Sequence, residues 1–176
     1  MAKWAGNKVG VGGNLGTPAL DLLEQAAVVY VLELSSFQLE RTTALNAAAA
    51  TVLNISADHL DRHEDIAEYA QEKQNVFNGN GVMVINADDP VVDAMQEAGR
   101  RIVTFSIKKD ADFYIALKGD VEYLMHNKQC LMPLTELPLE GRHNAANALA
   151  ALALGASIGL DEQAMCSALK TFKGLD

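Results

Sequence analysis

Short apolar runs without alternation recur along the first two-thirds of the chain, as expected for strands buried on both faces. These runs cover residues 28–32, 49–55, 81–86 and 101–105. Helical patterns fill the windows 65–77 and 90–99 between the later runs. Because strands that alternate with helices form parallel sheets through right-handed crossovers, the pattern predicts an α/β fold. We expect a mostly parallel sheet flanked by helices.

The pattern changes over residues 106–140, where two weaker apolar stretches lie at 113–117 and 121–125. Turn-forming residues follow each stretch, so this part predicts a small antiparallel meander. Two helices are predicted after it, at about 142–158 and 162–172. Gly159 should end the first helix and Asp161 should cap the second. The chain of 176 residues has the length of one domain.

Charge and cysteine content narrow the functional classes. The formal net charge is −9, and an acidic chain is poorly suited to bind nucleic acid or an anionic membrane. Cys130 and Cys166 form no metal-binding spacing and no disulfide framework, which indicates a reducing compartment. The N-terminus has no signal-peptide pattern, and the apolar stretch 145–160 is too short and polar to span a bilayer. We therefore expect a cytoplasmic protein.

A glycine-rich segment, GVGGNLG at 10–16, follows a short apolar strand. Thr17 and Pro18 come next, and this pair predicts the start of a helix. Backbone N–H groups at such a turn suit an anion, although the alternative is a tight turn without a ligand. The segment is not a dinucleotide-binding fingerprint, because Leu15 occupies the place of the third glycine.

Polar side chains follow two of the predicted strands, where ligands bind in open α/β sheets. Glu33, Ser35, Ser36 and Gln38 follow the first, and they offer oxygen ligands for Mg²⁺ and polar contacts for a substrate. The alternative is a solvated strand end with a serine as helix N-cap. The second strand leads into the segment DHLDRH at 58–63. This segment is dense in Asp, His and Arg, which predicts a functional site.

Two further features come from helical spacing. Lys73 falls on the apolar stripe of the helix predicted at 65–77. An inward lysine is costly unless it is paired, neutral or modified, and a neutral amine reacts with CO₂ to give a metal-binding carbamate. The alternative is a lysine that extends along the helix edge to water. Asn144 and Asn147 share one side of the next long helix, where two amides could read a purine edge or serve as cap and surface residues.

Five segments in this order resemble the central domain of the Mur ligase family, and the resemblance implies a fold similar to that of the P-loop NTPases. They are GGNLGTPAL at 12–20, ELSSFQLE at 33–40, LNISADHLDRH at 53–63, INADDP at 85–90 and GRHNAANALAA at 141–151. The resemblance is greatest to the members that add D-glutamate to UDP-N-acetylmuramoyl-L-alanine (UDP-MurNAc-L-Ala). It implies an ATP-dependent amide ligase of cytoplasmic peptidoglycan precursor synthesis, monomeric at full length, which activates a carboxylate as an acyl phosphate.

The resemblance also implies roles for particular residues. Glu33, His59 and Lys73 as a carbamate would hold two Mg²⁺ ions and form the catalytic set. Gly13, Asn14, Ser35 and Gln38 would contact UDP-MurNAc-L-Ala. Asn144 and Asn147 would contact the adenine of ATP.

The chain departs from the family pattern because it contains no GxxGK[ST] phosphate-binding loop. We expect all 176 residues to belong to one central domain, cut before that loop, with the UDP-binding and C-terminal ligase domains outside the chain. The chain alone is then expected to be inactive. Three alternatives remain open: a folylpolyglutamate synthase fragment, a non-catalytic nucleotide-sugar-binding module and, least supported, a dinucleotide-binding oxidoreductase.

Overall fold

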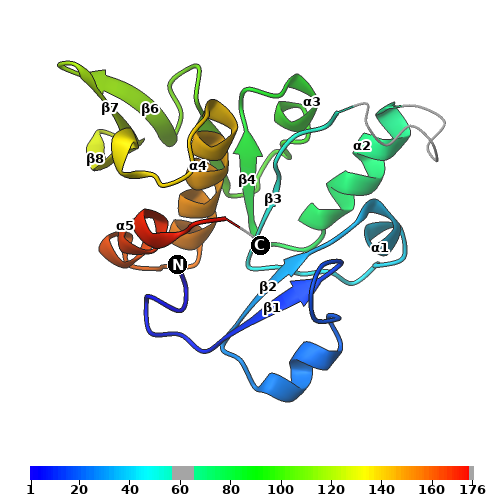
Figure 1. Cartoon of the computed structure of the whole chain (residues 1–176). Coiled ribbons are helices and arrows are strands. Elements are labelled where there is room, and N and C mark those ends of the chain that lie inside the picture. The colour runs from blue at the N-terminus through cyan, green and yellow to red at the C-terminus, as the bar shows by residue number, and fades with distance from the viewer. Residues whose placement is uncertain (57–65, 175–176) are drawn as a thin grey trace.

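The computed structural model describes residues 1–56 and 66–174, which form two sheets with helices packed beside them. The larger sheet is six-stranded in the order β3-β4-β5-β6-β7-β8. The smaller sheet is two-stranded and consists of β1 and β2. Figure 1 shows the smaller sheet set apart from the larger one, below the helix α2. The predicted α/β class is correct, but the expected single sheet is divided in two.

The parallel half of the larger sheet contains β3 (Ala49–Val52), β4 (Val82–Asn86) and β5 (Ile102–Ser106). Between β3 and β4 the chain forms α2 (Ile66–Gln74) and a 3₁₀ turn, η3 (Asn75–Phe77). The helix predicted at 90–99 is shorter than expected: α3 (Pro90–Asp93) is a single turn. A turn closed by the bond from Arg100 N to Glu97 O (3.2 Å) then returns the chain to the sheet.

The predicted antiparallel meander is confirmed. It consists of β6 (Phe113–Lys118), β7 (Val121–His126) and β8 (Gln129–Pro133), and β6 also pairs with β5 in parallel. The meander therefore extends the same sheet. A short turn, η4 (Leu134–Glu136), follows β8.

The two predicted C-terminal helices are α4 (Arg142–Ser157) and α5 (Glu162–Thr171). Asp161 caps α5 as expected, since its carboxylate accepts from the backbone N–H of Ala164 (2.8 Å). The largest core cluster joins α4 and α5 to the sheet through fully buried side chains such as Leu149, Leu152 and Met165. Burial of each such side chain stabilises the fold by about 1.5–3 kcal/mol.

The smaller sheet corrects the prediction that residues 28–32 are buried on both faces. Here β1 (Val9–Gly13) pairs in parallel with β2 (Val29–Glu33). Four of the five β2 residues are exposed, and Val31 retains 49% of its accessible surface. Within the described residues β2 pairs with β1 alone, so a strand whose apolar composition is typical of the centre of a sheet is largely exposed.

The prediction that Thr17 and Pro18 open a helix is wrong. The carbonyl oxygen of Thr17 accepts from the backbone N–H of Gly13 (2.9 Å), and Thr17 forms a bridge with Gly12. This pairing holds Thr17 in an extended strand contact and delays the helical turn. The turn is a 3₁₀ segment, η1 (Asp21–Gln25), whose N-cap position has no side-chain hydrogen bond. No helix begins at Thr17 and Pro18, so the glycine-rich turn lacks the helix N-terminus on which the anion interpretation depended.

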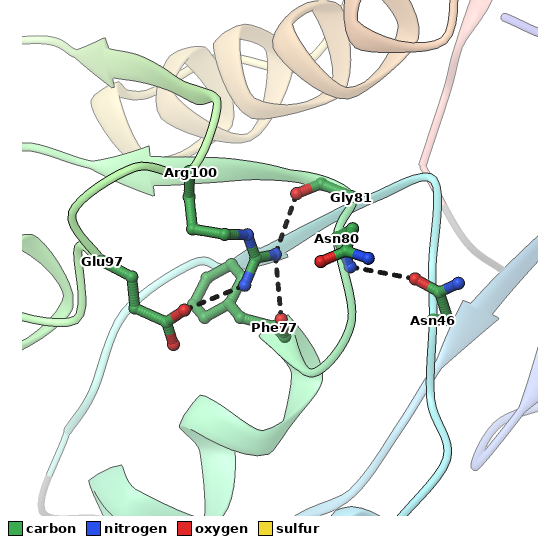
Figure 2. A network of polar contacts seen from close by, with 6 residues as sticks. All are labelled: Asn46, Phe77, Asn80, Gly81, Glu97 and Arg100. Carbon is green, nitrogen blue, oxygen red and sulfur yellow. Dashed lines mark hydrogen bonds and ion pairs between the residues drawn. The ribbon is translucent and has the colours of Figure 1, made fainter.

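Arg100 joins the helical segment before β4 to the sheet (Figure 2). Its Nη2 donates to the carbonyl oxygens of Phe77 (3.0 Å) and Gly81 (2.9 Å), and its Nη1 pairs with Glu97 (2.9 Å). Nearby, Asn46 Oδ1 accepts from the backbone N–H of Asn80 (3.0 Å). The end of η3 is thus fixed to the start of β4.

The two cysteines lie in different surroundings. Cys166 is buried in the core beside α4, Cys130 is exposed, and both are free thiols. In the described parts of the chain no helix is long and apolar enough to cross a membrane.

Candidate functional site

Gly13, Asn14 and Glu33 meet where β1 and β2 end. Gly13 is the register partner of Glu33, and the backbone N–H of Asn14 donates to the carbonyl oxygen of Glu33 (2.7 Å). A side chain at position 13 would collide with that oxygen, and the φ of Gly13 is +117°. Only glycine suits this close approach. The predicted substrate contacts Gly13 and Asn14 are therefore placed beside the predicted metal ligand.

Ser35 and Gln38 form a reciprocal cap at the start of α1 (Ser36–Glu40). The Gln38 Oε1 accepts from the backbone N–H of Ser35 (2.9 Å), and the Ser35 Oγ accepts from the backbone N–H of Gln38 (3.3 Å). Ser35 is thus the N-cap of α1, which is the structural role that the alternative gave to a serine of this segment. Both side chains lie near the end of β2, as predicted, and each already forms a hydrogen bond with the other residue.

Lys73 reaches the same place from α2. Its Nζ donates to the carbonyl oxygen of Leu34 (3.5 Å), next to Glu33, and lies 5.8 Å from the centre of the Tyr69 ring. Lys73 is half-buried, in agreement with its place on the apolar stripe. Burial also raises the pKa of Tyr69, so this ring stays neutral beside the amine. Residues that are 39 positions apart in sequence, Leu34 and Lys73, therefore meet at one site.

The third predicted member of the metal set, His59, lies outside the described residues, as do Asp58 and His63. Over 1–56 and 66–174, no group of three or more His, Cys, Asp or Glu side chains could hold a metal ion. A carboxylate at Glu33 and a carbamate on Lys73 would nevertheless supply the oxygen donors that Mg²⁺ prefers.

The segment INADDP at 85–90, for which the resemblance implies no role, organises the carboxyl end of β3 and β4 in the larger sheet. Asn86 Nδ2 donates to the carbonyl oxygen of Leu53 (2.7 Å), and Asp89 Oδ2 accepts from the backbone N–H of Ile55 (2.8 Å). These bonds fix the chain that leaves β3. The sequence offered one signal, because an Asp before a Pro is a common N-cap, and Asp89 does cap α3.

Asn144 and Asn147 line a separate cavity of about 240 Å³. Its other walls are largely apolar and include Leu139, Ala151 and Phe172. Asn144 Nδ2 donates to the carbonyl oxygen of Glu140 (2.7 Å), and the N-cap of α4 is Gly141, so Asn144 is not the cap residue. An apolar cavity with two amides at its wall suits a flat, polar-edged ring, and its volume is below the ~300–1,000 Å³ of typical ligand pockets.

A family profile described as "Mur ligase middle domain" matches residues 11–155. The chain belongs to the Mur ligase family. Three relatives named "UDP-N-acetylmuramoylalanine--D-glutamate ligase" match nearly all of it, from Methylococcus capsulatus (53% identical), Nitrosococcus oceani (49%) and Pseudomonas fluorescens (48%). They cover 100%, 99% and 100% of the chain. The chain spans 39–40% of the length of these relatives.

Solved structures agree on the fold of this Mur ligase domain. A UDP-N-acetylmuramoyl-L-alanyl-D-glutamate--2,6-diaminopimelate ligase aligns with a TM-score of 0.81 at 28% identity, over 99% of this chain and 43% of its own. A pseudomurein peptide ligase type C from Methanothermus fervidus aligns with a TM-score of 0.76 at 18% identity, over 98% and 45%. The second likeness shows the fold alone.

Proposed function

We propose that the protein containing this chain is a cytoplasmic, ATP-dependent ligase that adds D-glutamate to UDP-MurNAc-L-Ala during peptidoglycan precursor synthesis. The observation that carries the proposal is the meeting of Lys73 with the turn after Glu33. A second candidate site, the largely apolar cavity beside Asn144 and Asn147, lies elsewhere on the same chain. The names of the relatives supply the substrates, because they match the whole chain at 48–53% identity.

The reaction proceeds in two transfers. A carboxylate oxygen of UDP-MurNAc-L-Ala attacks the γ-phosphorus of ATP, and ADP leaves with the electrons of the broken P–O bond. The amine of D-glutamate then attacks the carbonyl carbon of the acyl phosphate, loses a proton and expels phosphate. The residues at the end of β2 orient the first carboxylate, and bound Mg²⁺ would offset negative charge on the transferred phosphoryl group.

The chain's own residues divide this work. Glu33, His59 and carbamylated Lys73 would hold Mg²⁺, and the hydrogen bond to the Leu34 carbonyl keeps Lys73 beside Glu33. Gly13 and Asn14, with Ser35 and Gln38, contact the sugar nucleotide. Asn144 and Asn147 bind the edge of adenine while the apolar cavity wall packs on its face. The full-length protein acts as a monomer on small molecules, without nucleic acid or membrane.

The test uses the full-length protein and measures phosphate release with Mg²⁺-ATP, UDP-MurNAc-L-Ala and D-glutamate. We expect release that requires all three, and little with L-glutamate. Glu33→Gln and Lys73→Ala should each lower kcat by at least about 100-fold, since each removes a group that stabilises the transferring phosphoryl. Asn147→Leu should raise KM for ATP with a smaller change in kcat.

Controls in the same assay separate the alternatives. The 176-residue chain is run in parallel and is expected to be silent, since it has no phosphate-binding loop. Asp120→Asn, on an exposed turn residue of the meander, should leave kcat and KM unchanged. Release with a folate acceptor instead of the UDP-sugar would move the assignment to a folylpolyglutamate synthase. Absence of release with every acceptor would leave a non-catalytic binding module.

A further inference from the structure

We propose that Gln38 is a positioning residue whose side-chain oxygen holds the turn between Glu33 and α1 in the shape that Lys73 requires. The inference rests on the proposed function, and it assigns to one atom of Gln38, Oε1, a task other than contact with substrate. It follows from the cap at the start of α1 and from the contact between Lys73 and Leu34.

The cap fixes Ser35 from both sides. Oε1 of Gln38 accepts from the backbone N–H of Ser35 at 2.9 Å and lies 3.3 Å from the Ser35 Oγ, which donates to it. In return, the Ser35 Oγ accepts from the backbone N–H of Gln38 at 3.3 Å. A capping box of this kind satisfies two backbone donors that would otherwise lack partners. The backbone of Ser35 therefore has one favoured orientation.

That orientation decides where the Leu34 carbonyl points, because the Leu34 C=O and the Ser35 N–H belong to one planar peptide unit. The Ser35 N–H is directed to Gln38 Oε1, so the Leu34 carbonyl is directed the opposite way, to Lys73 Nζ (3.5 Å). Glu33 precedes this unit by one residue. One rigid peptide thus connects Gln38 on one side with Lys73 on the other.

The cap is itself attached to the buried part of the molecule. Ser36 and Leu39 of α1 are 6% and 1% exposed, and α1 packs against α2, the helix that carries Lys73. Thr42 Oγ1 also donates to the Gln38 carbonyl oxygen (2.5 Å). Because α1 is anchored in this way, the cap transmits a fixed geometry from the helix pair to the turn, whose preceding residue Glu33 is exposed.

Substitutions can distinguish the role of the Gln38 Oε1 from the role of its Nε2. Oε1 already takes part in two contacts with Ser35, so a donor bond to substrate is left to Nε2. Gln38→Glu keeps an oxygen that accepts from Ser35 and loses the NH₂ donor, since glutamate is as good as glutamine at this capping position. Gln38→Met has a similar length and loses both.

The experiment measures kcat, KM for UDP-MurNAc-L-Ala and the Mg²⁺ half-saturation of the full-length protein. We expect Gln38→Met to lower kcat by about 10–100-fold, as displacement of reacting groups by a fraction of an ångström to one ångström does, and to raise the Mg²⁺ requirement. Gln38→Glu should recover most of kcat, with its defect confined to KM. Asp161→Ala is the matched control, because it removes an N-cap from α5 and should change stability without changing kcat.

Two kinetic results would overturn the inference: an equal loss of kcat in Gln38→Glu and Gln38→Met, or a normal kcat in Gln38→Met. Hydrogen exchange at the backbone amides of Ser35 and Gln38 provides a readout without turnover. Exchange should accelerate in Gln38→Met and stay slow in Gln38→Glu. If the full-length protein releases no phosphate, the proposed function fails, and the exchange pattern alone decides the positioning role.

Discussion

Replacement of Arg100 by methionine is expected to destabilise the chain by about 2–4 kcal/mol, mainly through two backbone carbonyls that lose their donor. The Arg100 side chain is 16% exposed, and its Nη2 donates to the carbonyl oxygens of Phe77 and Gly81 at 3.0 and 2.9 Å. A partly buried acceptor left unpaired costs about 1–3 kcal/mol. The pair with Glu97 contributes little, about 0–1 kcal/mol, because Glu97 is 45% exposed.

The measurement is urea-induced unfolding of the 176-residue chain, followed by far-ultraviolet circular dichroism. Arg101 provides a matched control, because it is the next residue, carries the same charge and is exposed. We expect Arg101→Met to stay within about 0.5 kcal/mol of the wild type, as surface substitutions do. Glu97→Gln should also cause only a small change, since it leaves the two carbonyl bonds in place.

A refuting outcome is simple to recognise. If Arg100→Met and Arg101→Met shift the urea midpoint equally, the contacts in Figure 2 do not hold the end of η3 to β4. Phe77, whose carbonyl Arg100 holds, lies only four residues after Lys73, so these contacts also bear on the position of Lys73. Without them, the contact with Leu34 and the packing of α2 would alone position Lys73.

Two further predictions concern burial. Burial raises the pKa of the Cys166 thiol above its ordinary value of 9.0, so the folded thiol ionises less readily than the unfolded one and stability falls as the pH rises above about 9. The loss of urea stability from about pH 8 to about pH 10 should therefore be smaller in Cys166→Ala, and an equal loss in both proteins would contradict this account. The exposed apolar side chains of β2 should make the 176-residue chain self-associate as its concentration rises in sedimentation experiments. Val31→Lys should reduce this association, whereas Leu117→Lys, at an even more exposed apolar site on β6, should not; equal effects would mean that β2 is not the contact surface.

Local patterns predicted the meander and the two C-terminal helices well. Asp161 caps α5 through its own side chain, and the turn between β6 and β7 contains Gly119 with a positive φ. Caps and tight turns depend on residues that are neighbours in the sequence, so they can be predicted from the sequence alone. Thr17 presents a local signal of equal quality, yet its carbonyl pairs with Gly13 and no helix begins there. A strand contact between residues four apart displaced the cap.

Burial is harder to predict from the sequence. An apolar run shows that a strand favours apolar contacts, but it does not show which contacts the strand makes in the fold. Residues 28–32 read as a central strand, and in the described chain they form half of a two-stranded sheet with Val31 about half exposed. The sequence did predict that Lys73 lies on an inward stripe. Its partner, the Leu34 carbonyl, is a backbone atom, and no pattern of side chains could name it.

The two parts of the candidate site differ in how they are supported, and this difference bears on how substitutions will act. The cavity of Asn144 and Asn147 is built on α4, whose opposite side contributes Leu149 and Leu152 at 0% exposure to the largest core cluster. We therefore expect a change there to alter stability together with the proposed nucleotide binding. The site at Glu33 lies on the exposed sheet and depends on a few bonds: Asn14 to Glu33, Gln38 to Ser35 and Lys73 to Leu34. Because these bonds bury little surface, their loss should alter kcat much more than the free energy of unfolding.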